Sequence, residues 1–193
     1  MGAEFSTWQK ILGEQSLVEA VRAAQLPGIP LVSVGSGNGV TERQVGEALK
    51  TDVICVDPDS FSYAPESENG MLPDFPHVEA LLEKKKELVG DCLLMLVWTD
   101  PNDSTYDVEA IELLRPRSIV VVCEITGSGG SSALHEWMQK LPGVGDLYDG
   151  PVSWLTPPDE PAKIRDKYRI ADIHAKMCGE TAKYAIVTIR RVD

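Results

Sequence analysis

The stretch LVSVGSGNG, residues 31–39, decides how this chain folds. Its first four residues are apolar apart from Ser33, which is typical of a buried strand, and three glycines then stand at alternate positions of a turn. Thr41 is a good N-cap for the helix predicted next, and Glu42 in the first turn of that helix suits the helix dipole. A strand, a glycine turn and a capped helix place bare backbone beside a ligand.

Strand-like apolar runs and helical periods alternate along the rest of the chain. Further strands are predicted at residues 53–56, 92–98, 118–123, 145–155 and 184–191. Helices are predicted at residues 16–25, after Thr41, and at 78–89, 108–114 and 132–140. Strands separated by single helices form a mainly parallel sheet with helices on both faces, and the alternation in 184–191 predicts an antiparallel last strand. The predicted fold class is therefore α/β and Rossmann-like.

One domain is expected from 193 residues with 43% apolar content, because a chain of this length builds one core. The proline-rich and glycine-rich passages of the sequence are too short to link two domains. Within the single domain 1–193 we distinguish four parts: a helical lead-in at 1–30, the Rossmann-like core at 31–155, an insertion at 156–183 and the final strand at 184–193.

The charge balance excludes some classes of partner. The chain has 18 Lys and Arg against 30 Asp and Glu, a net charge of −12, so generic binding to nucleic acid is disfavoured. No apolar run approaches the roughly 20 residues that span a bilayer. Glu4, Trp8 and Lys10 stand where a secretory signal would be continuously apolar, so we expect an intracellular, cytoplasmic protein without a membrane segment.

The cysteines point the same way. Cys55, Cys92, Cys123 and Cys178 are far apart in the sequence, and three of them lie in or beside apolar runs. A zinc site would need close pairs of cysteines to chelate the metal, so no metal site is predicted. We expect four buried free thiols, as in a reducing compartment.

Asp57 closes the strand at 53–56, eighteen residues after Gly39. A carboxylate at that place could accept hydrogen bonds from the two hydroxyls of a ribose, so turn and acid together predict a ligand that contains a nucleoside. The alternative is that the glycines only form a tight turn and Asp57 only starts another. Val40 stands where a dinucleotide-binding motif has its third glycine, which argues against NAD, and the absence of a P-loop lysine argues against phosphoryl transfer.

The motif Ser33-Val34-Gly35-Ser36-Gly37-Asn38-Gly39 resembles the first motif of the class I S-adenosylmethionine-dependent methyltransferases. Residues 111–122, IELLRPRSIVVV, are similar to the late helix, turn and fifth strand of that family. The resemblance implies a single-domain methyltransferase fold of the seven-stranded type, with S-adenosylmethionine as cofactor and an unknown methyl acceptor. The implied cofactor-binding residues are Ser33, Gly35, Ser36, Gly37, Gly39 and Asp57. Asp100 would lie near the transferred methyl group as the candidate catalytic residue.

Two departures from the family pattern support an alternative function. Ser33 stands where active members commonly have Asp or Glu, and residues 60–76 lack a convincing third strand with an acid for the adenine. The alternative is a methyltransferase-like protein without catalysis that acts as a binding or structural component. Asp100 has a second interpretation too, as a turn or cap residue before Pro101.

The remaining candidates are histidines and basic residues. His174 is placed in a helix with Cys178 one turn on, and His77 and His135 are expected at helix starts or on the surface. The insertion at 156–183 concentrates cations in an acidic chain, which predicts either a solvated surface or a site for an anionic acceptor or partner at 163–176. These cations are Lys163, Arg165, Lys167, Arg169 and Lys176.

Overall fold

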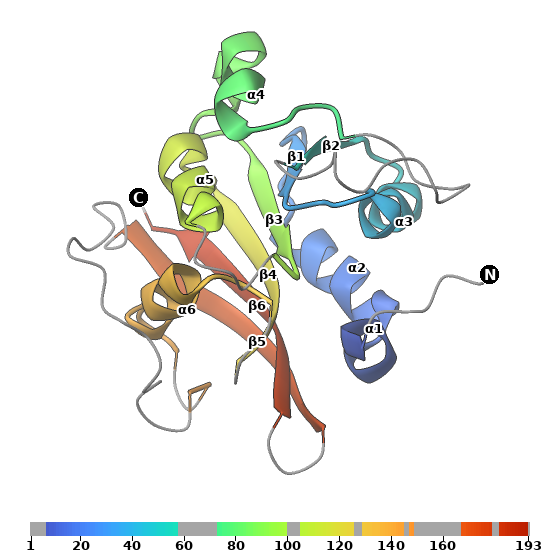
Figure 1. Ribbon diagram of the computed structural model, residues 1–193, viewed down its shortest axis with the longest axis vertical. Coiled ribbons are helices and arrows are strands. Elements are labelled where there is room, and N and C mark those ends of the chain that lie inside the picture. Colours follow the sequence, from blue (N-terminus) through green and yellow to red (C-terminus); the bar gives the residue numbers. More distant parts are fainter. Residues whose placement is uncertain are drawn as a thin grey trace.

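The computed structural model describes residues 7–57, 73–99, 105–125, 129–144, 147–148, 167–178 and 182–192, and six strands in these residues form one sheet (Figure 1). The helices are α1 (Thr7–Leu12), α2 (Glu14–Ala24), α3 (Val40–Leu49), α4 (Val78–Lys84), the short 3-10 helix η1 (Lys86–Leu88), α5 (Tyr106–Leu114) and α6 (Ser132–Gln139). The strands are β1 (Leu31–Val34), β2 (Val53–Val56), β3 (Leu93–Val97), β4 (Ser118–Glu124), β5 (Tyr168–Cys178) and β6 (Ala182–Arg191).

The sheet has the order β2-β1-β3-β4-β6-β5. Strands β1 to β4 are parallel to one another, whereas β6 lies between β4 and β5 and is antiparallel to both. The predictions of a mainly parallel sheet and an antiparallel last strand are confirmed. Because β1 to β4 run the same way, the residues that follow them meet at one edge of the sheet.

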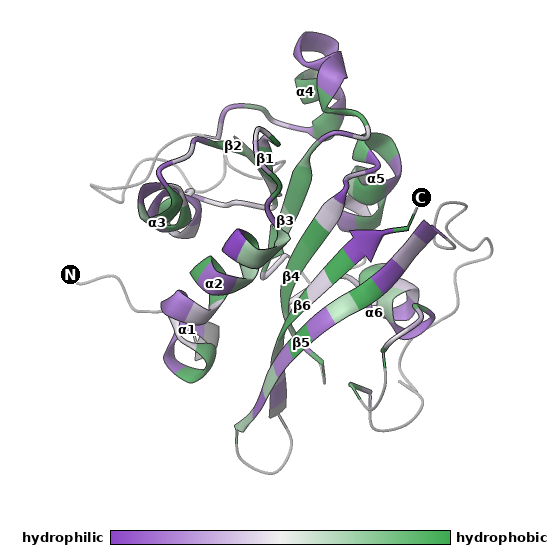
Figure 2. Cartoon of the chain, turned by 180° about the vertical axis from the view of Figure 1, so that it is seen from behind, coloured by the Kyte–Doolittle hydropathy of each residue, from purple (hydrophilic) through white to green (hydrophobic). Residues whose placement is uncertain are grey.

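Helices α1 to α3 cover one face of the sheet and α4 to α6 cover the other, as predicted (Figure 1). Successive strand residues point to opposite faces, so Leu94 and Leu96 pack with α4 to α6 while Leu93 and Met95 pack with α1 to α3. Strand β3 is buried at all five positions, as its continuous apolar run indicates. Figure 2 shows the hydrophobic colour concentrated in the central strands.

Two predicted helix ends were wrong. Helix α3 begins at Val40, with Gly39 in the left-handed region as its N-cap, and not after Thr41. A glycine at φ 66° ends the turn without the strain that another residue would carry there. The helix predicted at 78–89 ends at Lys84 and continues as η1.

The largest correction concerns residues 156–183. Tyr168–Cys178 form β5, which pairs with β6 along its length, so this part of the predicted insertion belongs to the sheet. His174 and Cys178 therefore lie in an exposed strand rather than a helix. The strand is rich in polar residues and shows no clear alternation, because among the described strands β5 pairs with β6 alone and much of it is exposed. Of the strand predicted at 145–155, the structure describes Leu147 and Tyr148, which lie in a bend.

Strand β2 is the last strand on its side in the part of the chain that the structure describes. Phe75 forms a single parallel bridge with Val56, and the backbone N–H groups of Asp74 and Phe75 donate to the carbonyl of Cys55. A short contact of this kind occupies the place beside β2 where a further strand of the predicted seven-stranded sheet would begin.

Candidate functional site

The glycine turn lies at the carboxyl end of β1. Gly35, Gly37 and Gly39 all have positive φ angles, of 75°, 55° and 66°. The N–H groups of Gly35 and Ser36 both donate to the carbonyl of Val56, at 2.9 and 3.3 Å, which ties the turn to the end of β2. The backbone therefore bends over the sheet edge in a conformation that glycine adopts with little strain.

Asp57 lies directly beside this turn. Its Oδ2 accepts a hydrogen bond of 2.6 Å from the N–H of Gly37, and the residue is only 6% exposed. The two parts of the site predicted from distant stretches of sequence are thus brought together. A carboxylate has about four lone-pair positions and can accept several hydrogen bonds at once. The ribose-binding role of Asp57 stays a prediction.

The three glycines differ in what surrounds them. A Cβ atom at Gly35 would lie 2.9 Å from both Thr99 Cγ2 and Tyr106 Oη, so the fold itself excludes a side chain there. A Cβ atom at Gly37 would meet no atom of the described residues within 4 Å. No described side chain therefore fills the space over Gly37.

Ser33 does not face that space as a separate binding group. It is fully buried in β1, and its Oγ donates a hydrogen bond of 2.9 Å to Oε1 of Glu42 on α3. Burial raises the pKa of Glu42 to about 7, opposed by its backbone hydrogen bond and the Ser33 hydroxyl and assisted by the negative charge of Asp57. A carboxylate from the next helix thus reaches the serine side chain of the glycine motif.

Glu42 is a site residue that the sequence did not reveal as such. Its place in the first turn of a helix has an ordinary explanation in the helix dipole, which hides its burial. A signal was present nonetheless. Glu42 follows Gly39 by three residues, so it lies in the first turn of the helix, close to Ser33. A polar residue inside an otherwise apolar strand needs a partner, and a search for that partner would have found Glu42.

A second polar cluster lies after β3. Both carboxylate oxygens of the buried Asp107 accept hydrogen bonds: Oδ2 from Thr99 Oγ1 (3.2 Å) and the N–H of Ser131 (2.9 Å), and Oδ1 from Ser131 Oγ (2.7 Å) and the N–H of Val108 (2.8 Å). Burial raises the pKa of Asp107, and these hydrogen bonds oppose the rise. The carboxylate of Asp107 links the starts of α5 and α6 to the end of β3, so it stabilises the residues that follow β3 beside the candidate site.

His135 lies in the first turn of α6, at a helix start as expected, but it is buried, so the alternative of a surface position was wrong. Its Nδ1 lies 3.1 Å from Tyr148 Oη and its Nε2 lies 3.2 Å from the carbonyl oxygen of Gly129. Burial lowers the pKa of His135 to about 4, which keeps the ring neutral at pH 7. His77 is, as expected, at a helix start, where its Nδ1 accepts from the N–H of Ala80.

Trp98 follows β3 with a φ of 56°, which is rare for an aromatic residue. Its ring stacks on Tyr184 at a centroid distance of 5.7 Å. A Cβ atom at Gly129 would lie 2.7 Å from the indole, so glycine is required there. The close packing on both sides makes Trp98 a packing residue rather than an open stacking surface.

Several predicted residues are not placed. Asp100, the candidate catalytic residue, lies outside the described residues, as do Lys163 and Arg165. Lys176 donates from Nζ to the carbonyl of Ile11 at 3.2 Å, so it caps the C-terminal end of α1. Among the described residues no group of three or more His, Cys, Asp and Glu side chains could hold a metal ion, and no helix there has the length and apolar character of a membrane span.

A cavity of about 980 Å³ extends from the glycine turn along β2. Its lining includes Gly39 and Glu42 at the turn, Cys55 on β2, and Asp74 and Phe75 opposite. Oδ2 of Asp74 accepts from the N–H of Cys55 at 2.8 Å, so this acid is bound to the edge of β2. The volume is sufficient for a nucleoside-sized ligand.

No protein-family model matches the chain, and no curated protein matches it. Among solved structures, a variant of the 16S rRNA (adenine(1408)-N(1))-methyltransferase from Catenulisporales acidiphilia is 16% identical over 93% of this chain and 92% of that chain, with a TM-score of 0.44. Magnesium protoporphyrin IX methyltransferase from Synechocystis PCC 6803 with bound SAH is 16% identical over 99% of this chain and 90% of that chain, with a TM-score of 0.49. The same enzyme with bound SAM is 14% identical over 99% and 86%, with a TM-score of 0.48.

Proposed function

We propose that this protein binds S-adenosylmethionine and transfers its methyl group to an acceptor that is not yet identified. The observation that carries the proposal is the glycine turn with Asp57 beside it: three glycines at positive φ, no atom of the described residues within 4 Å of a Cβ at Gly37, and a nearly buried carboxylate 2.6 Å from the Gly37 nitrogen. An open backbone and a fixed acid at the carboxyl edge of a parallel sheet suit a ligand with a nucleoside and a compact polar chain.

Different residues would bind different parts of the cofactor. The backbone of Gly35, Gly37 and Gly39 would surround the methionine part, and Asp57 would accept hydrogen bonds from the ribose hydroxyls. When bound, the cofactor supplies an electrophilic methyl group. The protein then has to align an acceptor with that methyl group and, for an acceptor that must lose a proton, provide a base. Asp100, three residues after β3, remains our candidate for a residue near the methyl group.

A specific observation favours the second candidate, a methyltransferase-like protein without catalysis. The bond from Gly37 to Asp57 and the bonds from Gly35 and Ser36 to Val56 hold the turn without any ligand. Such a turn can persist as architecture alone. Binding of S-adenosylmethionine separates the two candidates only in part, because a noncatalytic member can retain the cofactor, so methyl transfer has to be measured as well.

Calorimetry with S-adenosylmethionine and S-adenosylhomocysteine tests the cofactor site. We expect both to bind to the wild type, and Asp57→Ala to weaken binding by about tenfold to a hundredfold, as for the loss of hydrogen bonds to a charged group. Asp57→Asn is the matched control for the turn, because an amide oxygen can still accept from Gly37. Equal binding by the wild type and Asp57→Ala would show that Asp57 does not hold the ribose.

Gly37→Asn tests the open space independently. Asn tolerates positive φ, and a Cβ atom at this position meets no atom within 4 Å in the part of the chain that the structure describes, so thermal unfolding should change little. Its side chain would occupy the proposed ligand space, and cofactor binding should fall at least tenfold. Transfer of a labelled methyl group to a cell extract, lost in Gly37→Asn, supports the enzyme; binding without any transfer supports the noncatalytic alternative.

A further inference from the structure

A second pocket lies at the opposite edge of the sheet from the glycine turn. It has a volume of about 490 Å³ and is lined by Val89, Gly90, Arg115, Lys167, Tyr168, Arg191 and Val192. Arg115 precedes β4, Lys167 precedes β5 and Arg191 ends β6. Because β6 is antiparallel to β4, these residues meet at the amino ends of the parallel strands. The seven residues of β4 separate the two edges by roughly 20 Å.

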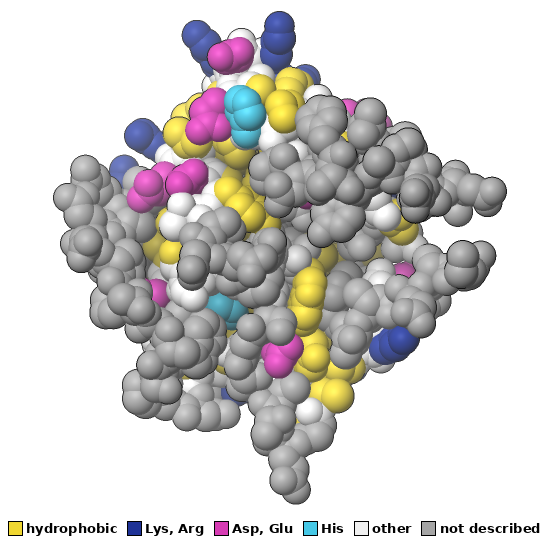
Figure 3. Space-filling view, in the orientation of Figure 1, with side chains coloured by type: hydrophobic (Ala, Val, Ile, Leu, Met, Phe, Trp, Pro, Cys, Tyr) yellow, Lys and Arg dark blue, Asp and Glu magenta, His cyan; other side chains and the backbone are white. Residues whose placement is uncertain are grey.

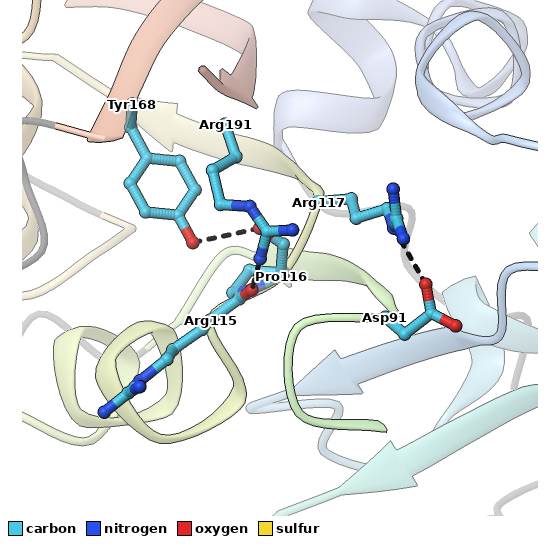
Figure 4. A network of polar contacts seen from close by, with 6 residues as sticks. All are labelled: Asp91, Arg115, Pro116, Arg117, Tyr168 and Arg191. Atoms are coloured by element: carbon cyan, nitrogen blue, oxygen red, sulfur yellow. Dashed lines mark hydrogen bonds and ion pairs between the residues drawn. The ribbon is translucent and has the colours of Figure 1, made fainter. Parts of the chain in front are cut away.

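The lining is cationic in a strongly acidic protein. Three cations line the pocket, and among the described lining residues there is no acidic side chain, although the net charge of the chain is −12. Asp91, which follows the lining residue Gly90, binds Arg117 at 2.8 Å (Figure 4). Lys and Arg side chains are also visible over α4 and beside α5 in the space-filling view (Figure 3). A local positive region of this kind attracts a small anion, while the charge of the whole molecule repels a long polyanion.

Two side chains of the pocket, Arg191 and Tyr168, donate to backbone carbonyl groups. Nη1 of Arg191 donates to the carbonyl oxygen of Arg115 at 2.8 Å, and the Tyr168 hydroxyl donates to the carbonyl oxygen of Pro116 at 2.9 Å (Figure 4). The first bond orients the guanidinium of Arg191. The second bond uses the proton of the Tyr168 hydroxyl, so Tyr168 contributes mainly its ring to the pocket wall.

Arg115 itself is in the left-handed region, with φ 49° and ψ 50°, as the C-cap of α5. Glycine is the usual residue there, and another residue costs about 1–2 kcal/mol. The side chain of Arg115 is exposed, and only its carbonyl oxygen takes part in the bond from Arg191. An arginine therefore occupies a position at which glycine would have less backbone strain.

The size and walls of the pocket indicate the kind of anion. An inorganic phosphate would fill a small part of about 490 Å³, so a ligand that fills it carries an organic group too. Val89 and Val192 are 43% and 38% exposed and offer apolar surface beside the cations. Guanidinium groups match the oxygens of a phosphate in geometry and charge.

We propose that this pocket binds a small organic phosphate, with the phosphate on Arg115, Lys167 and Arg191 and the organic group against Val89, Tyr168 and Val192. The site is independent of the glycine turn and does not rest on the proposed methyl transfer. It extends the anionic partner expected at residues 163–176, because Lys167 belongs to it while its other cations come from α5 and β6.

Calorimetry with phenyl phosphate, inorganic phosphate and phenol tests the proposal, with S-adenosylhomocysteine present to occupy the glycine turn. We expect phenyl phosphate to bind with a dissociation constant below 1 mM, inorganic phosphate at least about tenfold more weakly, and phenol not measurably. Equal binding of phenol and phenyl phosphate, or no binding of phenyl phosphate at 10 mM, would overturn the proposal. A ten-nucleotide RNA that binds where phenyl phosphate fails would also overturn it, in favour of a polymer.

Variants locate the binding. Arg115→Gly removes one cation, suits the backbone conformation and keeps the carbonyl oxygen that Arg191 contacts, so the fold should be maintained. Lys167→Gln removes a second cation from an exposed position. Each should weaken phenyl phosphate at least about tenfold and reduce the salt dependence of binding. Arg22→Gln, an exposed cation on α2, is the matched control and should bind as the wild type does. Unchanged affinity in both pocket variants would refute the assignment.

Discussion

Glu42 shows how one buried carboxylate sets a pH dependence. Its pKa is about 7 in the folded protein, compared with 4.5 for the exposed group. The folded state therefore binds more protons than the unfolded state between these values, and the free energy of unfolding falls as the pH rises from 4.5 to 7. Above about pH 7 the charged, buried carboxylate destabilises the fold by a constant amount of about 3 kcal/mol.

Glu42→Gln should remove this contribution while an amide oxygen still accepts from Ser33. The free energy of unfolding of the variant, relative to the wild type, should rise by about 3 kcal/mol between pH 4.5 and 7 and then stay level. Urea denaturation at several pH values measures it. Glu47→Gln, an exposed acid on the same helix, serves as the control with no such slope. A difference between Glu42→Gln and wild type that does not vary with pH would mean that Glu42 stays charged in the fold.

Ser131 connects a helix cap to the Asp107 cluster. Its Oγ accepts from the N–H of Leu134 at 3.1 Å and donates to Asp107 Oδ1 at 2.7 Å. Ser131→Ala would lose a cap and leave a buried carboxylate short of a donor, so we expect a loss of about 2–4 kcal/mol. Ser132→Ala, one residue further and only half-buried, should cost less than about 1 kcal/mol. Equal effects in urea denaturation would contradict the role of Ser131.

At the scale of elements, the ends of the helices depart from what the local sequence favours. Helices α3 and α5 both end on a long cationic residue in the left-handed region, Lys50 at φ 54° and Arg115 at φ 49°. Such a residue carries strain that glycine avoids. The packing of each helix on the sheet sets the path of the chain and imposes that conformation.

Lys50→Gly should therefore raise the free energy of unfolding by about 0.5–1 kcal/mol, the relief of strain exceeding the entropy that glycine adds to the unfolded chain. Lys50→Ala is the matched control, because it removes the same side chain and retains the strain. Thermal unfolding of the pair measures the difference directly. If the alanine variant is at least as stable as the glycine variant, the helix end is not strained.

The tertiary structure determines which of the four cysteine thiols are accessible to a reagent. The four cysteines are free, as predicted, but only Cys92 and Cys123 are buried; Cys55 is half-buried and Cys178 is exposed at the end of β5. The expectation that all four are buried was wrong for Cys55 and for Cys178, which lies in an exposed part of β5. Burial raises the pKa of Cys55, Cys92 and Cys123 to about 12 in each case.

Alkylation by iodoacetamide at pH 8 should therefore modify Cys178 first and alone in the native protein, with the other three reacting only in denaturant. Peptide mass mapping against time identifies each site, and Cys178→Ser should abolish the fast reaction. Mass measurement of the untreated protein checks the free thiols. A stable loss of two hydrogens without reductant, or early modification of Cys123, would contradict this arrangement.

Local pattern was sufficient for the parallel part of the fold. The strands at 31–34 and 53–56 have the predicted bounds; the strand at 93–97 is one residue shorter than predicted at each end, and the strand at 118–124 is one residue longer at its end. Each is a short apolar run between turn residues, and burial on both faces leaves little choice of residue. The glycine turn and Asp57 were also recognisable, since alternate glycines and an acid at a strand end are local features.

Contacts between distant segments decided the rest. β5 could not be recognised because an exposed edge strand has no apolar run, and only its pairing with β6 defines it. Glu42 became a buried partner of Ser33, His135 a neutral core residue, and Arg115 part of a cationic pocket through neighbours far away in the sequence. The sequence by itself determined which segments are strands and helices where burial dictates residue type; the environment of a polar side chain depends on what the fold packs around it, and only the tertiary structure supplies that.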